Sequence, residues 1–391
     1  MKQKMIVGAL AALPLIAMAD VSIYGTLKGS VEHNSLSGQA SQNDVQDNTS
    51  VIGFKGSEEM GNGVKGIWQV ESRVHLDGKS NGDTLGSRQT FVGLDGGKLG
   101  QVRIGNLNNA FEGRYAVDQW QYDGEINDRG PNGFGPTYST ISGATGLAVF
   151  TNSGDRLKNA IRYDSASFDG FSGSLMYSFG ENSSKAMGGE PAESASDILG
   201  LNLNYAFNDA LSAVYAYQRE NQPAREWLGR PPINPAASKS LFEVDYHANR
   251  LFLSAAYQIA TGYDWVDDFS GSGRSTYHGG TMGNSGIGAT PAVARLKTQQ
   301  MALSAAYHFG AFTPKVSYAK GWNQQAKGHT IADSGYRQYI AGVDYALSKR
   351  TTAGVSYGNL RFDKNTAVAQ DVNRGSRATL KATSVTLAHS F

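Results

Sequence analysis

The side chains with the clearest chemical potential in this sequence are cations that recur at strand-like spacing. Lys28, Arg73 and Arg103 belong to the polar set in stretches where polar and apolar side chains alternate, and Arg162 lies between two apolar residues. Successive side chains of a strand point to opposite faces, so these four cations share the face turned away from the apolar side chains. The face on which Arg88 lies is ambiguous, because its apolar neighbours fit either face.

A long interruption of the alternating pattern supplies acidic counterparts. About fifty residues separate the strand predicted to end near 106 from the one predicted to start near 156, far more than an ordinary loop needs. Asp118, Asp123 and Glu125 lie in this segment, together with aromatic residues such as Phe111 and Trp120. Two interpretations remain open: the segment folds toward the cations with its aromatic rings on the wall, or it is a solvated surface loop.

Opposed charges across a narrow passage would do electrostatic rather than covalent chemistry. A low-dielectric constriction lined by cations on one side and carboxylates on the other focuses the electric field and biases which ions enter. Catalysis has less support, because the seven histidines are scattered and none is grouped by sequence with a serine and an aspartate. His75 is the best candidate base, but a polar lining role suits it better. We therefore predict no catalytic residue, no cofactor and no metal site.

The elements that must position these charges are amphipathic strands. Leu199, Leu201 and Leu203 alternate with Gly200 and Asn202, and the same pattern recurs to the end of the chain. We predict sixteen strands, at residues 21–34, 49–59, 64–77, 87–95, 101–106, 156–164, 171–179, 197–207, 210–219, 239–248, 250–260, 296–309, 312–322, 335–347, 351–361 and 377–391. The fold class is all-β, and this repetition favours an antiparallel transmembrane β-barrel.

The N-terminus and the composition place this barrel outside the cytoplasm. Two lysines precede an apolar run, and Ala17-Met18-Ala19 fits a signal-peptidase site, so residues 1–19 are predicted to be a cleaved signal peptide. Residues 20–391 then form one barrel domain. The chain has no cysteine, which suits an oxidising compartment. A net charge of +1 gives no general attraction to nucleic acid, so no nucleic-acid partner is expected.

The joints between the predicted strands alternate in length. Tight turns such as Gly61-Asn62-Gly63 and Asn208-Asp209 alternate with long polar joints, and tyrosines gather near the strand ends. Bacterial outer-membrane barrels have short periplasmic turns, long external loops and an even strand count. This layout predicts an outer-membrane barrel of a Gram-negative bacterium with both termini in the periplasm.

Five blocks of sequence carry a resemblance to a known family. Tyr24–Lys28, Ser50–Gly63, Arg88–Leu94, Asn159–Phe171 and the closing His389–Phe391 resemble the general porins of Gram-negative bacteria, in particular the neisserial and other β-proteobacterial trimeric porins. The resemblance covers the whole mature chain, although the middle is similar by pattern more than by motif.

The resemblance implies a sixteen-stranded barrel, a homotrimer, and a third extracellular loop folded inward as the pore constriction. It also implies a basic wall facing an acidic loop. The wall would comprise Lys28, Arg73, Arg88, Arg103 and Arg162, and the loop would contribute Asp118, Asp123 and Glu125. The terminal Phe391 is similar to the family's signal to the barrel-assembly machinery. The partners expected are therefore other copies of the chain, outer-membrane lipid and that machinery.

The function expected is passive diffusion of ions and small hydrophilic solutes, with weak anion selectivity. Three alternatives stay open. Trp120 and other aromatic residues could form a stacking surface in a channel specific for sugars, or the channel could be specific for phosphate. The long loops could form an adhesion platform. A barrel enzyme is the third alternative, although it would need a nucleophile or an activated water beside a base.

Overall fold

The computed structural model describes residues 20–78, 84–111, 116–120, 156–179, 197–221, 237–267, 276–278, 294–326, 328–366, 369 and 376–391. The predicted signal peptide, Asp123 and Glu125 lie outside the described residues. Within these ranges there is one short 3-10 helix, Gly97–Leu99, and no helix is long and apolar enough to cross a membrane.

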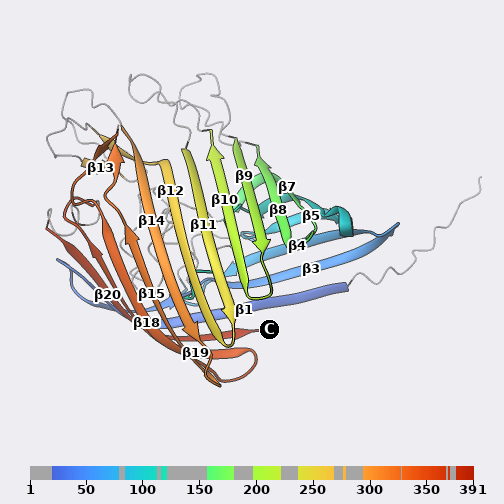
Figure 1. Cartoon of the computed structure of the whole chain (residues 1–391). Helices are drawn as coiled ribbons and strands as arrows, with labels where there is room; N and C mark the ends of the chain where they lie inside the picture. The colour runs from blue at the N-terminus through green and yellow to red at the C-terminus, as the bar shows by residue number, and fades with distance from the viewer. Residues whose placement is uncertain are drawn as a thin grey trace, which may run out of the picture.

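Sixteen strands of the described residues form one closed antiparallel barrel, as predicted (Figure 1). Each strand pairs with the next, and the last, β20, pairs with the first, β1, over the register Thr26↔Ser390 to Leu36↔Leu380. The strands are β1 (Asp20–Leu36), β3 (Ser50–Gly61), β4 (Val64–Val74), β5 (Thr90–Asp95), β6 (Gln101–Asn108), β7 (Arg156–Asp164), β8 (Phe171–Ser178), β9 (Ile198–Ala206), β10 (Leu211–Glu220), β11 (Ala237–Ala248), β12 (Leu251–Asp267), β14 (Ala294–Tyr307), β15 (Phe312–Gly321), β18 (Tyr336–Ala346), β19 (Thr351–Phe362) and β20 (Ala378–Ser390). Closure leaves no strand edge unpaired, which is the condition for a sheet to cross a membrane.

Four short strands lie outside this ring and were not predicted. β2 (Gln42–Asp47) pairs with β1, β13 (Thr276–His278) pairs with β12, and β16 (Gln325–Ala326) and β17 (His329–Thr330) form a small hairpin beside β14. β12 is longer than predicted, because it continues past an irregularity between Thr261 and Trp265 and pairs with β13 and β14 there. These additions lie at the end of the barrel opposite the tight turns.

The turns that join β9 to β10 and β11 to β12 lie at the lower end of the barrel in Figure 1, near the C-terminus. Residues with positive φ make the tight hairpins: Asn62 has φ 52° between two glycines with φ 91° and 76°. A two-residue loop of this kind matches the right-handed twist of the strands it joins. The predicted alternation of short and long joints is therefore confirmed for the described turns.

The two faces of the barrel have opposite polarity. On β1, Ile23 and Val31 are 62% and 61% exposed. Ser30, Glu32 and Asn34 are buried on the other face. Apolar side chains thus cover the outside, where a membrane would contact them, and polar side chains line the inside. This polarity fixes the register of the strands, because a slip by one residue would exchange the faces.

The chain end completes the seam between β20 and β1. The backbone N–H of Gly25 donates to the carbonyl of Phe391 at 3.1 Å, and the N–H of Phe391 donates to the carbonyl of Gly25 at 3.0 Å. A Cβ atom on Gly25 would lie 2.5 Å from Cζ of the Phe391 ring, so the ring lies where a larger residue could not fit.

Candidate pore lining

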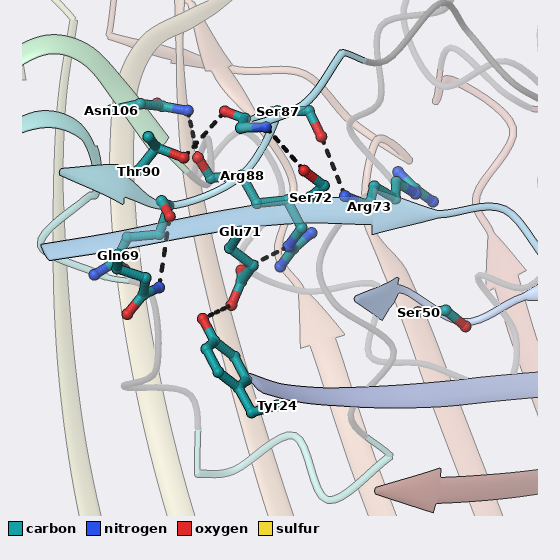
Figure 2. A network of polar contacts seen from close by, with 12 residues as sticks. Tyr24, Ser50, Gln69, Glu71, Ser72, Arg73, Ser87, Arg88, Thr90 and Asn106 are labelled. Atoms are coloured by element: carbon teal, nitrogen blue, oxygen red, sulfur yellow. Dashed lines mark hydrogen bonds and ion pairs between the residues drawn. The ribbon is translucent and has the colours of Figure 1, made fainter. Parts of the chain in front are cut away.

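The first part of the basic wall is a network on β1, β4 and the segment before β5 (Figure 2). The hydroxyl of Tyr24 donates to one carboxylate oxygen of Glu71 at 2.8 Å, and Nε of Arg88 donates to the other at 3.1 Å. Tyr24 and Glu71 share the polar face of the barrel wall, so Arg88 also points to that side. The sequence left this orientation open. The structure decides the orientation: Arg88 lies just before β5, and its side chain extends to Glu71 on β4.

Arg73 lies one step further along the same wall. Its Nε is 3.8 Å from a carboxylate oxygen of Asp47, which belongs to the additional strand β2. The backbone N–H of Arg73 donates to the hydroxyl of Ser87 at 3.1 Å, as Figure 2 shows. Its register partner Val51 is on the same face. Arg73 is two residues from Glu71 on β4, so its side chain lies on the same face of the wall as Glu71.

Arg103 and Arg162 are direct cross-strand partners on β6 and β7. Two like charges placed opposite each other would repel, but both guanidinium groups contact the carboxylate of Asp164. The nitrogen–oxygen distances are 2.5 Å to Arg103 and 2.7 Å to Arg162. Arg103 also lies over the ring of Phe91, 5.2 Å from its centroid. Asp164 thus holds the two cations side by side.

Residues Ala110–Phe111 and 116–120 of the long segment contact several parts of the wall. The carbonyl of Ala110 accepts a hydrogen bond from Asn202 of β9 at 3.1 Å. The carboxylate of Glu243, on β11, accepts the backbone N–H groups of Ala116 and Val117 at 3.0 and 3.3 Å. The backbone of the segment is therefore bound at β9 and β11, which are separated in the ring by β10 alone.

The same segment is bound further round the ring by its last described residues. The indole N–H of Trp120 donates to the hydroxyl of Ser317 on β15 at 2.8 Å. The Lys28 ammonium, on β1, donates to the carbonyl of Trp120 at 3.2 Å, and the Lys315 ammonium donates to the carbonyl of Gln119 at 2.9 Å. The contacts of the segment thus extend along the polar face from β9 to β1.

Small apolar residues on this face make room for the aromatic rings. Ala256, Ala302 and Ala319 are direct neighbours across β12, β14 and β15, and they belong to one buried cluster with Phe111 and Trp120. Two lysines lie over these rings: Lys239 is 4.6 Å from the centroid of Phe111, and Lys315 is 4.5 Å from that of Trp120. Each such contact contributes roughly 0.5–2 kcal/mol.

Asp118 is the one predicted loop acid among the described residues. Its carboxylate accepts the backbone N–H of Trp120 at 3.1 Å, and its side chain is partly exposed. The structure therefore brings Asp118 next to the carbonyl that Lys28 contacts.

No role was assigned from the sequence to the carboxylates that accompany the basic wall. Glu71 and Asp164 each lie two residues from a predicted cation, Arg73 or Arg162, and therefore on the same face. This two-residue spacing is the sequence signal by which both carboxylates could have been identified. Glu243 could not be found in this way, because its backbone partners are 126 and 127 residues away in the chain.

A closed barrel with an apolar exterior, a polar interior and charged side chains along the inner wall defines a transmembrane channel of the β-barrel class. Comparison with known proteins gives the family. Residues 7–365 match the Gram-negative porin family, and the chain belongs to it.

Relatives and solved structures agree with this assignment. The major outer membrane protein P.IA of Neisseria meningitidis serogroup C is 30% identical over 100% of both chains. The major outer membrane protein P.IB of Neisseria lactamica is 33% identical over 93% of this chain and 95% of its own length. An anion-selective porin from Comamonas acidovorans has the same fold, with a TM-score of 0.65, 20% identity, and coverage of 95% of this chain and 100% of that one. The protein is therefore a diffusion channel of the Gram-negative outer membrane rather than an enzyme.

Proposed function

We propose that the protein is a weakly anion-selective porin in which the segment from Ala110 onward folds into the lumen and forms the constriction. Lys28, Arg73, Arg88, Arg103 and Arg162 act as the basic wall of this constriction, with Asp118, Asp123 and Glu125 as its acidic counterpart. Ions and small hydrophilic solutes would pass between the two. The transverse field would orient them, and the width of the gap would limit their size.

The observation that carries this proposal is the course of the segment along the polar face. Its contacts run from Asn202 on β9, through Glu243 on β11, to Lys28 on β1. A solvated surface loop, the other interpretation of the sequence, would not bury Phe111 and Trp120 to 0% and 2% exposure against the wall. The described part of the segment therefore favours a narrowed lumen.

Weak rather than strong selectivity follows from the balance of charges on the wall. The five cations are accompanied by three carboxylates that contact them, Asp47, Glu71 and Asp164. This leaves an excess of two positive charges on the wall side of the gap, opposite the three loop acids, so the selectivity expected from the whole constriction is weak. An excess of positive charge on the wall attracts anions. Each cation–carboxylate pair has no net charge, and salt at 0.1 M screens its remaining field beyond about 10 Å.

Solved structures of the same fold support anion selectivity and trimeric assembly. The Comamonas porin is described as anion-selective, and an outer-membrane protein of Vibrio cholerae with a TM-score of 0.60 and 14% identity is described in a trimer form. We extend both properties to this chain, which would assemble as a homotrimer in outer-membrane lipid. Residues 1–19 would be removed on export, both termini would lie in the periplasm, and Phe391 would be recognised by the assembly machinery.

Reversal-potential measurements in a planar bilayer test the selectivity. The wild-type protein should show conductance steps in multiples of three and a reversal potential displaced toward chloride in a potassium chloride gradient. Replacing Arg73 and Arg103 with serine should shift that potential toward cations, whereas Lys98→Ser, at an exposed turn, should leave it in place. An unchanged potential in the double variant would refute the role assigned to the wall.

A further inference from the structure

The outer surface of the barrel has an apolar groove that diffusion through the lumen does not use. The groove has a volume of about 760 Å³ and extends over β11, β12, β14, β15, β18 and β19. Its lining includes Leu253, Val316 and Tyr357, which are 43%, 53% and 46% exposed. No described residue of the lumen segment lines it. Because its exposed lining residues lie on the apolar outer face of their strands, the groove faces the membrane.

The strand register explains the groove. Tyr246, Leu253, Ala305, Val316, Ala341 and Tyr357 are successive cross-strand neighbours in one row. Two tyrosines thus flank a row of smaller side chains, and the alanines leave the space between them empty. The row lies two residues from the end of β11 at Ala248, about 7 Å from that turn, and six residues from the start of β19 at Thr351, about 20 Å from the β18–β19 turn.

The turns below the groove are basic. Arg250 lies in the β11–β12 turn, and Lys349 and Arg350 lie in the β18–β19 turn; all three are exposed. Within the described residues, no ion pair joins any of them to a carboxylate. The β14–β15 turn between them, residues 308–311, has no acidic residue.

The turns on the rest of the rim differ in charge. The β3–β4, β5–β6, β7–β8 and β9–β10 hairpins each carry at least one acidic residue at or beside the turn: Glu58 and Glu59, Asp95, Asp169, and Asp209. The basic part of the rim therefore coincides with the part that lies below the groove.

The backbone conformation at Arg250 also indicates a function for the basic turns. Asn249 and Arg250 have φ values of 52° and 66°, a pair of left-handed residues that favours Asn-Gly. An arginine in the second position costs conformational free energy that a glycine would not. Strain retained at one residue is a reason to look for a function of its side chain.

We propose that the groove and the basic turns together bind an anionic glycerophospholipid of the leaflet at the turn end. The phosphate of the headgroup would lie between Arg250 and the Lys349-Arg350 pair. An acyl chain would enter the groove between Tyr246 and Tyr357. The two turns are four strand spacings apart, about 19 Å across the strands, and the register places the β18–β19 turn three residues, about 10 Å, further along them. The separation is therefore about 22 Å, which long side chains from both turns can bridge together with a headgroup. Membrane proteins bind anionic headgroups at basic clusters in this way.

Native mass spectrometry of the purified, folded protein tests this site. Dioleoylphosphatidylglycerol or dioleoylphosphatidylcholine is added in detergent, and the retained lipid is counted. The combined variant R250G, K349S and R350S should weaken retention of phosphatidylglycerol by about tenfold or more, with little change for phosphatidylcholine. Glycine suits the left-handed position, so R250G alone should fold at least as well as the wild type and should show part of the loss.

Two further variants separate the alternatives. Ala305→Phe fills the groove and should lower retention of both lipids, whereas Val102→Phe, on the opposite outer face, should lower neither. The variant K65S with K98S removes cations from the acidic part of the rim. Loss of phosphatidylglycerol in this control equal to that in the basic-turn variant would overturn the proposal, because it would indicate unspecific attraction. Dissociation of the assembly by A305F would also overturn it, since the groove would then be occupied by a second copy of the chain.

Discussion

Asp164→Asn is the most informative change to the basic wall. The carboxylate of Asp164 contacts both Arg103 and Arg162, and its side chain is 22% exposed, so its charge reaches the water in the lumen. Asparagine keeps the shape and can still accept a hydrogen bond from one guanidinium. The variant therefore removes one negative charge while changing the packing little, and we expect anion preference to increase.

The size of the effect follows from Coulomb's law. For an ion that passes about 6 Å from the carboxylate in water, the interaction is about 0.7 kcal/mol, and 0.1 M salt reduces it by roughly half. The change has opposite signs for chloride and potassium, so the two differ by about 0.7 kcal/mol. This corresponds to an increase of about threefold in the chloride to potassium permeability ratio.

Reversal potentials in a potassium chloride gradient measure this ratio directly. Repeating the measurement at 1 M salt should reduce the difference between variant and wild type, since the screening length falls to about 3 Å. The control is Asp169→Asn, which removes the same charge at an exposed turn outside the lumen. A D164N ratio equal to that of the wild type, or a shift no larger than that of D169N, would refute the assignment of Arg103 and Arg162 to the constriction.

Three other changes test the lumen segment and the barrel seam. Glu243→Gln replaces a carboxylate that accepts two backbone N–H groups, so docking of the segment should weaken by about 2–3 kcal/mol. The single-channel current should then become noisier, while the heat-dependent gel mobility should remain that of a folded barrel. Trp120→Ala removes the ring and its bond to Ser317, so mean conductance should rise; a smaller conductance would contradict the course proposed for the segment. Phe391→Ala keeps both backbone bonds to Gly25, so refolding in detergent should remain close to wild type while assembly in cells falls; equal losses in both assays would indicate a role in stability alone.

Much of the fold could be predicted from sequence because barrel strands repeat a local rule. Alternation of apolar and polar side chains located all sixteen strands, and glycine and asparagine located the tight turns. Most strand ends differ from the prediction by a few residues, and β12 extends seven residues further than predicted. The short strands β2, β13, β16 and β17 were missed, because six residues or fewer contain too little alternation to be recognised.

The lining was predictable only in part, for a related reason. Parity placed Lys28, Arg73, Arg103 and Arg162 on the inner face, since parity depends on neighbours in the sequence. It could not place Arg88, which precedes its strand and contacts Glu71 across the wall. Nor could it show that Asp164 holds Arg103 and Arg162 together, because that contact requires β6 and β7 to be paired in register.

The sequence by itself thus determined the class of fold and the orientation of most strands' two faces, and it predicts an export signal at residues 1–19. These depend on the period of two residues in a strand and on local turn chemistry. Only the tertiary structure decided which charges neutralise one another, where the segment at 110–120 is bound, and that a groove lies above the basic turns. Each of these depends on residues brought together by closure of the barrel, and a linear pattern contains no information about distances across the ring.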